Sequence, residues 1–472
     1  MSIATQIQRL QSAKAALATS IENKGVTVPS STKLDGYAAL VDQIQQGGDT
    51  VIIGGNDCRN DKHNIIGADG NLIAAYSPSE LAALSSLPSI PSIDGLTPVG
   101  WSMTLEQFKN SDLGDAIYPR YTVTDGKIHI IFVIPEGGAT VRLMSLSTGT
   151  HSDWTVDWGD GTAVTSNIGT YTRIVDAPDA GVHTHTYTAA GEYECKVSST
   201  TGISTGPYGA EGGTHGVVHN NTIRYTKAIY LPSTFNFAGT GTGNSSTDSS
   251  ASTITEDFNT NVSYIEARGL FNTMDGGYVI VDDNWVESSM YTQSGKFERA
   301  NIYGIRLHPA QGCSDAHMFA YSKLTAIYSE EGYINSPQSR CFACCERLRT
   351  IPEVGGNADA VGDFAFFFTK SLRKIVFQSG VKYINRYAFR SDLVGTSLER
   401  IDFPSSVTSI SSPAVYGLYA DIYLRATTPP TLNSVPTCNC TWYVPASALF
   451  AYENATNWSV LYANGKIQSY NF

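Results

Sequence analysis

Residues 318–401 contain four variants of one short pattern: "MFAYSKLTAI" at 318–327, "CFACCERLRTI" at 341–351, "FAFFFTKSLRKIV" at 364–376 and "YAFRSDLVGTSLERI" at 387–401. Each has an apolar or aromatic anchor, then a leucine, then an isoleucine three residues later; the leucines recur at intervals of 24, 24 and 26 residues. Such a period is typical of a solenoid, in which each unit buries its apolar edge against its neighbours. The predicted repeat core is Met318, Leu324, Ile327, Phe342, Leu348, Ile351, Phe366, Leu372, Ile375, Phe389, Leu398 and Ile401.

These segments, together with "VKYINRYAF" and "SLERIDFPSSVTSI", resemble the BspA-type leucine-rich repeats of bacterial surface proteins. The tail, "IYLRATTPPTL" followed by "WYVPASALFAYENATNWSVLYANGKI", resembles the end segment of such arrays. It is expected to be the atypical capping unit that a solenoid needs at an open end. We therefore predict repeats with a C-terminal cap over 265–472. The resemblance implies a repeat type and specifies no ligand.

Length and composition predict a multidomain, mostly β protein. A chain of 472 residues is too long for one ordinary core. Only 16% of its residues are charged, and the net charge is −12. Nucleic acid is excluded as an expected partner, because neutralising phosphates requires a basic face. The longest apolar run, Ile130–Ile134, is too short to cross a bilayer, and residues 1–25 show no signal-peptide core, so we expect no membrane insertion.

Residues 1–48 are predicted to form a helical segment for attachment and oligomerisation. A 4-3 spacing of apolar residues indicates a first helix, and a second, shorter one follows Pro29. Two short helices cannot bury their apolar residues by themselves. We therefore expect them to pack on copies of themselves; a helical hairpin that caps its own domain is the alternative. The segment 7–44 also resembles the N-terminal helices of many phage tail and tail-fibre proteins. The residues of the expected self-association stripe are Ile3, Ile7, Leu10, Leu17 and Ile21.

Two further regions are predicted to join the domains. Residues 49–120 are expected to be a connector with short helices at 78–84 and around 104–109, and parts of it resemble a connector in the same phage proteins. Residues 204–264 are expected to be a loop and linker region, because 235–255 are rich in Gly, Ser and Thr.

Residues 121–203 resemble an immunoglobulin-like sandwich of the PKD type. The segment 155–158 alternates as a strand does, Gly-Asp-Gly predicts a tight turn, and a second alternating strand is expected over 193–197. The resemblance implies a structural role for the aspartate turn and the His-Thr-Tyr strand. The matching core and turn residues are Trp154, Trp158, Gly159, Asp160, Gly161, His185, Tyr187 and Tyr193.

Sharper chemical interpretations compete with this structural one. Asp157 and Asp160 have the residue types of a glycosidase pair, but no second acidic cluster accompanies them. His183 and His185 are weak candidates for a metal site shared between three chains. His215 and His219 lack an identifiable third ligand and are expected to be solvated.

Cysteines and catalytic motifs complete the chemical analysis. The eight cysteines, which include Cys341-x-x-Cys344-Cys345 and Cys438-x-Cys440, are expected to be buried free thiols rather than metal or redox ligands. Motifs of serine hydrolases, phosphate-binding loops and zinc proteases are missing from the sequence. We therefore predict no catalytic site, no metal, no cofactor and no enzymatic activity.

Taken together, the resemblances imply a bacteriophage virion structural protein, either a tail fibre or a tail-tip appendage. It would be assembled in the host cytoplasm and exposed on the particle, with the N-terminal region contacting itself, as a homotrimer, and other virion proteins. The repeats would be displayed for binding to host-surface glycan or protein, since tyrosine and tryptophan supply stacking area at low entropic cost. A capsid-bound head fibre or decoration protein, and a bacterial surface adhesin, are the alternatives.

Overall fold

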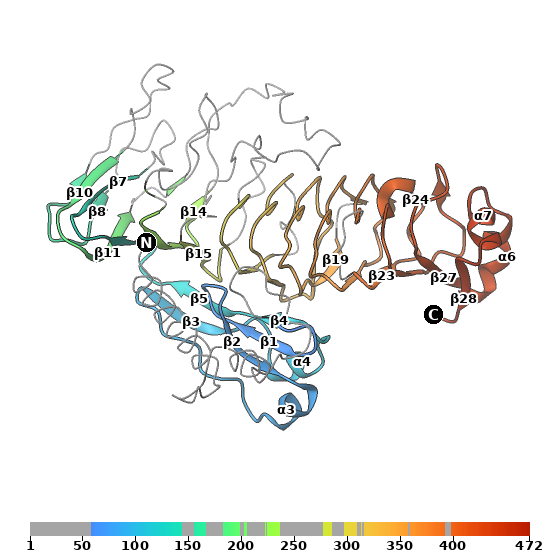
Figure 1. The fold of residues 1–472 in the computed structure, drawn as a ribbon, viewed down its shortest axis with the longest axis horizontal. Helices are drawn as coiled ribbons and strands as arrows, with labels where there is room; N and C mark the ends of the chain where they lie inside the picture. The colour runs from blue at the N-terminus through green and yellow to red at the C-terminus, as the bar shows by residue number, and fades with distance from the viewer. Residues whose placement is uncertain are drawn as a thin grey trace, which may run out of the picture.

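The computed structural model describes residues 58–143, 155–166, 183–198, 203–204, 222, 224–236, 277–285, 297–308, 313, 316–356, 359–391 and 398–472. Figure 1 shows the repeats as a row of coils, with a β-sheet at one end, the C-terminal cap at the other and a small lobe along one side. The described part contains no helix that is long and apolar enough to span a membrane. The expected N-terminal helices, Trp154, His215 and His219 lie outside the described residues.

The lobe comprises residues 58–123 and contains two small sheets and two short helices. One sheet has the order β2-β1-β4, and the other pairs β3 with β5. Both predicted helices are present, and each begins with a capping box: Ser77 exchanges hydrogen bonds with Glu80, and Thr104 does so with Gln107. The elements are β1 (His63–Ile66), β2 (Leu72–Tyr76), α3 (Pro78–Ala83), β3 (Leu96–Trp101), α4 (Leu105–Lys109), β4 (Ala116–Ile117) and β5 (Pro119–Val123).

A six-stranded sheet of order β15-β13-β6-β11-β8-β9 follows, together with the pair β10-β7. The expected strands at 155–158 and 193–197 are β8 and β11 within it. β6 reads Ile-His-Ile-Ile-Phe-Val-Ile, and most of its residues are buried. The strands of this region are β6 (Ile128–Ile134), β7 (Ala139–Leu143), β8 (Thr155–Asp157), β9 (Thr165–Ser166), β10 (His183–Tyr187), β11 (Gly191–Ser198), β12 (Ile203–Ser204), β13 (Thr226–Leu231), β14 (Phe235–Asn236) and β15 (Tyr278–Val281).

The predicted domain boundaries require correction. β13 lies in the expected linker of 204–264 and β15 in the expected repeat region, yet both pair in the six-stranded sheet. The amide of Val279 in β15 also donates to the carbonyl of Asn301, which joins the sheet to the first coil. One continuous hydrophobic core extends from the sheet into the repeats, and Ile229, Leu231 and Val279 of β13 and β15 are buried in it. The sheet and the repeats are therefore fused rather than tethered.

The coils of the repeat region pair mostly through short parallel strands on two faces. Along one face the strands form the pair β16-β17 and the five-stranded sheet β21-β23-β25-β27-β28, and along the second they form the four-stranded sheet β20-β22-β24-β26. The separate pair β18-β19 lies beside the first of these faces, because Val354 of β19 bridges to Phe377 at the end of β21. The strands are β16 (Gly304–Arg306), β17 (Ala326–Tyr328), β18 (Tyr333–Asn335), β19 (Glu353–Gly355), β20 (Ala360–Val361), β21 (Lys374–Val376), β22 (Tyr383–Ile384), β23 (Arg400–Phe403), β24 (Ser409–Ile410), β25 (Asp421–Leu424), β26 (Thr431–Leu432), β27 (Thr441–Pro445) and β28 (Ile467–Tyr470).

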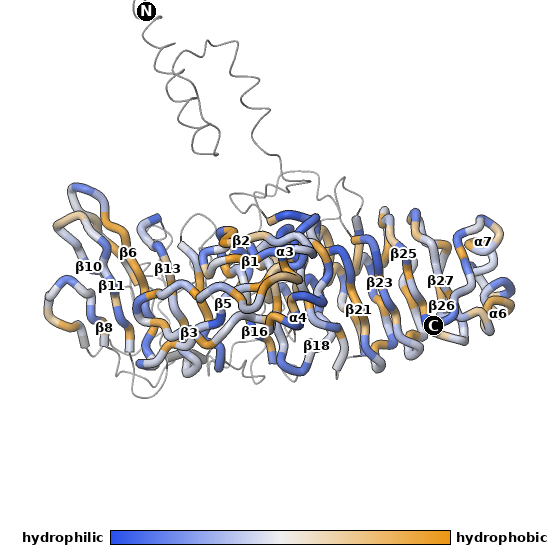
Figure 2. Tube along the Cα trace, turned by 90° about the horizontal axis from the view of Figure 1, so that it is seen from below, coloured by the Kyte–Doolittle hydropathy of each residue, from blue (hydrophilic) through white to orange (hydrophobic). Residues whose placement is uncertain are grey.

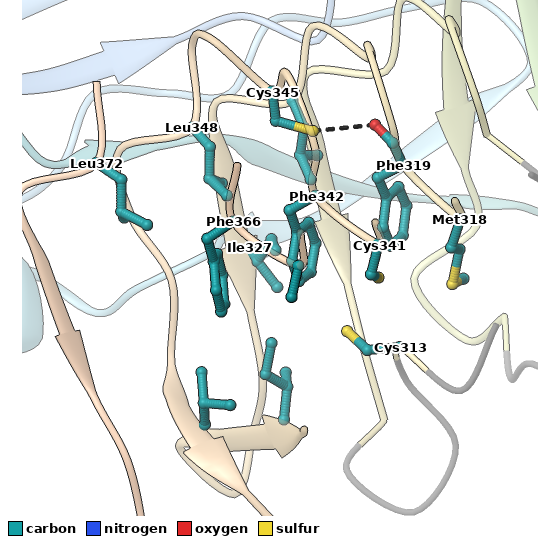
Figure 3. Close-up of a cluster of buried hydrophobic side chains, with 14 of the residues drawn as sticks. Cys313, Met318, Phe319, Ile327, Cys341, Phe342, Cys345, Leu348, Phe366 and Leu372 are labelled. Carbon is teal, nitrogen blue, oxygen red and sulfur yellow. Dashed lines mark hydrogen bonds between the residues drawn. The ribbon is translucent and has the colours of Figure 1, made fainter. Parts of the chain in front are cut away.

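A column of stacked phenylalanine rings runs through the coils. Neighbouring rings are 5.5–5.7 Å apart between centroids, close to the spacing of adjacent strands, and nearly parallel. This column corrects the predicted anchor Met318, because Phe319 occupies the equivalent position (Figure 3). Met318 is buried, but it is equivalent to Cys341 one coil later. The rings belong to Phe297, Phe319, Phe342, Phe366 and Phe389.

Backbone conformation explains the one-residue difference. Two residues on either side of Phe319, His317 and Tyr321 have φ angles of 61° and 59°, in the left-handed region, and the same holds on both sides of Phe342 and Phe366. These paired turns, rather than apolar character, decide which of two adjacent apolar residues joins the column. Otherwise the predicted repeat core is buried, except that Ile351 is only partly buried.

The C-terminal end closes the stack with short helices. β28 forms the edge of the five-stranded sheet, and Trp442, Tyr452 and Trp458 pack together behind it. The Oη of Tyr452 and the Nε1 of Trp458 donate to backbone carbonyls, so these buried polar atoms are satisfied. The helical elements are η3 (Ser412–Val415), η4 (Ala446–Ala448), α6 (Leu449–Asn454) and α7 (Trp458–Ala463).

Candidate binding face

We call the solvent-directed side of the first face of the repeats, from β16 to β28, the outer face. Each of its strands directs one large apolar residue into the core, and the next residue along the chain points outward, because side chains alternate along a strand. The inward residues are Ile305, Ile327, Ile375, Ile401, Ile422, Trp442 and Ile467, all buried. The outward residues that follow them are Arg306, Tyr328, Val376, Asp402, Tyr423, Tyr443 and Gln468.

The lobe covers the first part of this face. Seen from below, the lobe elements overlie the middle of the molecule, whereas β23, β25 and β27 lie clear of them (Figure 2). The guanidinium of Arg120 in β5 lies 4.9 Å from the ring centroid of Tyr328. The segment predicted to be a connector therefore docks on the repeats as a lobe, because its charged and polar groups bind to groups of the repeats. We call the part of the outer face under the lobe the covered half.

A buried ion cluster joins the lobe to the covered half. One Asp283 carboxylate oxygen accepts from Arg120 at 2.9 Å and from Arg306 at 3.2 Å. Burial raises the pKa of Asp283, although both arginines oppose that shift. Arg306 also pairs with the exposed Glu330 at 2.7 Å. A single buried carboxylate thus holds one cation from the lobe and one from the repeats.

Two arginines from successive coils, Arg349 and Arg373, donate hydrogen bonds to the lobe. Arg349 donates to the Oδ1 of Asn60 at 2.7 Å and to the carbonyl of Gly114 at 3.1 Å. Arg373 donates to the carbonyls of Asn60 and Leu113, both at 3.1 Å. The amide of Ala116 in turn donates to the Oγ1 of Thr350 at 2.8 Å. Burying Arg349 is feasible because several oxygen acceptors surround its guanidinium, whereas Arg373 stays partly exposed.

A cleft of about 210 Å³ lies at the margin of the lobe. It forms where the ladder is interrupted: Thr350 makes only an isolated bridge to β17, and Pro352 cannot donate a backbone hydrogen bond. Burial, reinforced by the charge of Asp112, raises the pKa of Asp115 to about 7. The cleft contains acidic and basic groups in similar number, so it has no clear charge preference. Its lining includes Asp112, Asp115, Arg349, Glu353, Arg373 and Lys374.

The remaining part of the outer face, from β23 to the C-terminus, is the open half. Tyr423 and Tyr443 are paired in register on β25 and β27, with their rings stacked 4.7 Å apart. Tyr470 packs edge-on against both, at 5.1 and 6.0 Å, and Phe472 lies 5.0 Å from Tyr470. Tyr470 and Phe472 remain 40% and 44% exposed. Four mutually packed rings therefore form a partly exposed aromatic surface.

Two arginines border these rings. The guanidinium of Arg400 lies 4.0 Å from the Tyr423 centroid and binds both carboxylate oxygens of Asp402, at 2.6 and 2.9 Å. Arg425 lies 4.6 Å from the centroid of Phe472. Within 398–472, where every residue is described, no carboxylate pairs with Arg425. The open half therefore combines aromatic area with one cation that is not neutralised locally.

The candidate acids of the six-stranded sheet serve its turn. The Oδ1 of Asp157 accepts from the amide of Gly159, and the Oδ1 of Asp160 accepts from the amide and hydroxyl of Thr162. His185 pairs with Asp160 at 2.7 Å and stacks on Trp158 at 4.7 Å. Desolvation by burial raises the pKa of Asp160, but the hydrogen bonds from Thr162 and His185 outweigh it and lower the pKa to about 2. These partners give both aspartates a structural role in the turn.

The other residues of this predicted core pack around that turn. The Oη of Tyr187 donates to the carbonyl of Trp158 at 2.7 Å, and its ring stacks on Tyr193 at 4.3 Å. Gly159, with φ of 76°, lies so close to the backbone of Glu194 that a Cβ would clash, and Gly161 has φ of 80°. The Trp-Gly-Asp-Gly turn therefore needs glycine at both positions.

The histidine and cysteine candidates do not converge on a metal centre. Among described residues, no group of three or more His, Cys, Asp or Glu is placed to hold a metal ion. The side chain of His183 is outside the described part of the chain. All eight cysteines are free thiols, six of them buried and Cys344 and Cys438 partly buried. The Sγ of Cys345 donates to the carbonyl of Phe319 at 2.9 Å, so this thiol joins neighbouring coils (Figure 3).

Comparison with known families supports the repeat assignment. Residues 291–421 match the model of the BspA type leucine rich repeat region, in six copies. The match begins before the first coil recognised in the sequence and ends at the first residue of β25, so most of the aromatic surface lies beyond it. The chain matches no curated protein.

Sequence reasoning missed both halves of the outer face. A usable signal existed for the open half, because Tyr423 and Tyr443 each follow the inward residue of an alternating strand. The covered half offered no such signal in the sequence. Its partners are more than 150 residues apart, and hydrophobic patterns place its charged side chains in solvent.

Proposed function

We propose that this protein is a bacteriophage virion structural protein, a tail fibre or tail-tip appendage, that displays its repeats for host-surface binding. The observation that carries the binding role is the open half, where Tyr423, Tyr443, Tyr470 and Phe472 form an aromatic surface on a rigid ladder. Aromatic clusters that remain exposed on a well-packed scaffold are typical of recognition sites. The virion assignment rests on the resemblance of residues 7–44 to phage tail proteins.

In this proposal the repeats form a solenoid and each region has a mechanical role. The six-stranded sheet, with its PKD-like turn at Trp158–Gly161, is a rigid spacer, because its core is continuous with that of the repeats. The N-terminal helices assemble the chain as a homotrimer and mount it on other virion proteins. The docked lobe fixes the direction in which the repeats leave the particle. No catalytic step is part of this function.

A bacterial surface adhesin is the second candidate, and the BspA-type match favours it. A capsid-bound head fibre or decoration protein is the third, and it is supported by the contact that the covered half makes with the lobe of the same chain. Gold-labelled antibody against residues 398–472 distinguishes the three in host lysates viewed by electron microscopy. Label at tail tips is expected. Label on capsids would establish the head-fibre alternative, and label on cell envelopes without particles would establish the adhesin.

A further inference from the structure

We propose that the open half binds a carboxylate-bearing sugar of a surface polysaccharide, with Arg425 facing the carboxylate and Tyr470 and Phe472 contacting the sugar ring. This inference rests on the proposed host-surface role and adds the chemical class of the ligand. It is drawn from the order of the rings, from the local charge balance and from the size of the surface.

The rings are held in place before any ligand arrives. Tyr423 and Tyr443 are fixed by strand register, with centroids 4.7 Å apart. Tyr470 belongs to β28, whose residues pair with β27 as far as Pro445. Phe472 packs against Tyr470 and beneath the Arg425 guanidinium. Because each ring contacts another ring, little conformational entropy remains to be lost on binding.

The placement of charge along the surface points to an acidic ligand at its Arg425 end, because the Asp421 carboxylate lies four residues before Arg425, at the opposite end of β25. Asp402 neutralises Arg400 through a bidentate pair, so Arg400 serves mainly to support the Tyr423 ring. Arg425 is exposed, and within 398–472 it has a ring contact and no carboxylate partner. A guanidinium presents two parallel N–H groups that match a carboxylate. A sugar acid would supply that carboxylate at the edge of the aromatic surface.

Size and polar surroundings favour a sugar over a protein. A stable protein interface needs roughly 800 Å² on each partner, and four partly buried rings provide much less. The outward side chains beside the rings are hydrogen-bonding groups: Asp421 and Thr441 precede the two ladder tyrosines by two residues, and Gln468 precedes Tyr470 likewise. Residues two apart in a strand share a face, so these groups border the rings and can bind sugar hydroxyls.

The covered half shows that this ladder accepts a planar group by stacking. There the Arg120 guanidinium of the lobe lies 4.9 Å from the ring centroid of Tyr328, an outward tyrosine of the same face. The lobe ends before β23, which leaves the equivalent positions of the open half uncovered (Figure 2). The proposed sugar site is therefore continuous with an interface that the chain already uses.

The test uses the full-length chain and immobilised bacterial oligosaccharides that contain uronic or ulosonic acids, each beside its carboxyl-reduced, neutral form. The wild-type protein is expected to prefer the acidic member of at least one pair. A Tyr470→Ala/Phe472→Ala double variant should bind that oligosaccharide at least about tenfold more weakly, as expected for loss of central aromatic contacts. Arg425→Gln should abolish the preference for the acidic form while retaining weak binding to both.

The control is Phe450→Ala on α6, which removes a 76% exposed ring outside the aromatic surface and should bind as wild type does. Thermal unfolding verifies that all variants fold, and Arg425→Gln tests the proposal even if the double variant does not. Equal binding by wild type and Arg425→Gln, or no preference for acidic forms, would overturn it. If no oligosaccharide binds but antibody still labels tail tips, the sugar site is wrong and the virion role stands.

Discussion

Tyr328 and Tyr443 occupy equivalent outward positions on the same ladder, one under the lobe and the other in the open half. Tyr328 faces Arg120, which is held in turn by the buried Asp283. Tyr443 faces Tyr423 and the partly exposed Tyr470. The covered half is thus built from charged groups that satisfy one another away from water, whereas the open half is built from rings that solvent still reaches. The first arrangement fixes the contact, because separating its partners would leave buried charges uncompensated, and the second is suited to a ligand that binds reversibly.

The largest expected effect comes from breaking the buried ion cluster. Asp283→Ala leaves Arg120 and Arg306 without their shared carboxylate, and Asp283 is only 6% exposed. Removing one partner of a buried pair costs about 3–5 kcal/mol, because the remaining charge is uncompensated. We expect that loss in the free energy of unfolding, measured with urea. Release of the lobe, seen as protease cleavage near residue 123, should accompany it.

The matched control removes a different partner of the same arginine. Glu330 pairs with Arg306 at 2.7 Å but is exposed. Glu330→Ala should therefore cost at most about 1 kcal/mol, as for surface pairs in general. If both variants lose equal stability, the covered half is not a buried electrostatic contact, and its contrast with the open half fails.

The second effect is a pH dependence confined to the covered half. Asp115 has its pKa raised to about 7 from an ordinary value of 3.8. The folded protein therefore holds a proton that the unfolded chain releases, so the free energy of unfolding should fall as pH rises from about 4 to about 7, and then level off. We expect a change of at most about 4 kcal/mol, which the partial exposure of Asp115 reduces. Asp115→Asn should remove this part of the slope in urea titrations at pH 5 and pH 8; an unchanged slope would show that Asp115 is solvated.

The two halves also show how far sequence reasoning reaches. The repeat core was predictable because Leu348, Leu372 and their equivalents return at a fixed interval and are all buried. The helices α3 and α4 were predictable because their capping boxes are local. The docking of the lobe was not, since Arg349 and Asn60 are 289 residues apart and nothing in either segment marks the other.

Finer errors have equally specific causes. Met318 and Phe319 are adjacent and both apolar, so composition could not show which joins the ring column; the left-handed turns at His317 and Tyr321 decide it. The sequence predicts a linker at β13 because a Gly- and Ser-rich stretch follows it. Its Thr-Lys-Ala-Ile-Tyr-Leu sequence is strand-like, yet sequence alone does not show that it pairs with β6. Non-local pairing is the information that a single sequence lacks.

The third effect compares the two ladder tyrosines directly. Tyr328→Ala removes the ring beneath Arg120, and Tyr443→Ala removes a ring from the open half. A cation–π contact contributes about 0.5–2 kcal/mol, with the upper end reached when the cation is desolvated, as Arg120 is. Tyr328→Ala should therefore be the more destabilising by about 1 kcal/mol in urea unfolding. Only Tyr443→Ala should weaken oligosaccharide binding. If Tyr443→Ala were the more destabilising of the two, the open half would serve stability, and the ring contact of the covered half would contribute little.

The smallest effect is expected at the boundary between the halves. Lys374 of β21 pairs with Asp112 of the lobe at 3.3 Å, and both side chains are exposed. Lys374→Ala should change the free energy of unfolding by no more than about 0.5 kcal/mol, and that change should disappear at 1 M salt, because water and ions screen an exposed pair. Asp283→Ala should retain most of its effect at the same salt concentration. If the loss caused by Lys374→Ala is large and insensitive to salt, the cleft margin is dry. The covered half would then exclude water as far as its border at β21, and the exposed aromatic surface would begin directly beside that border.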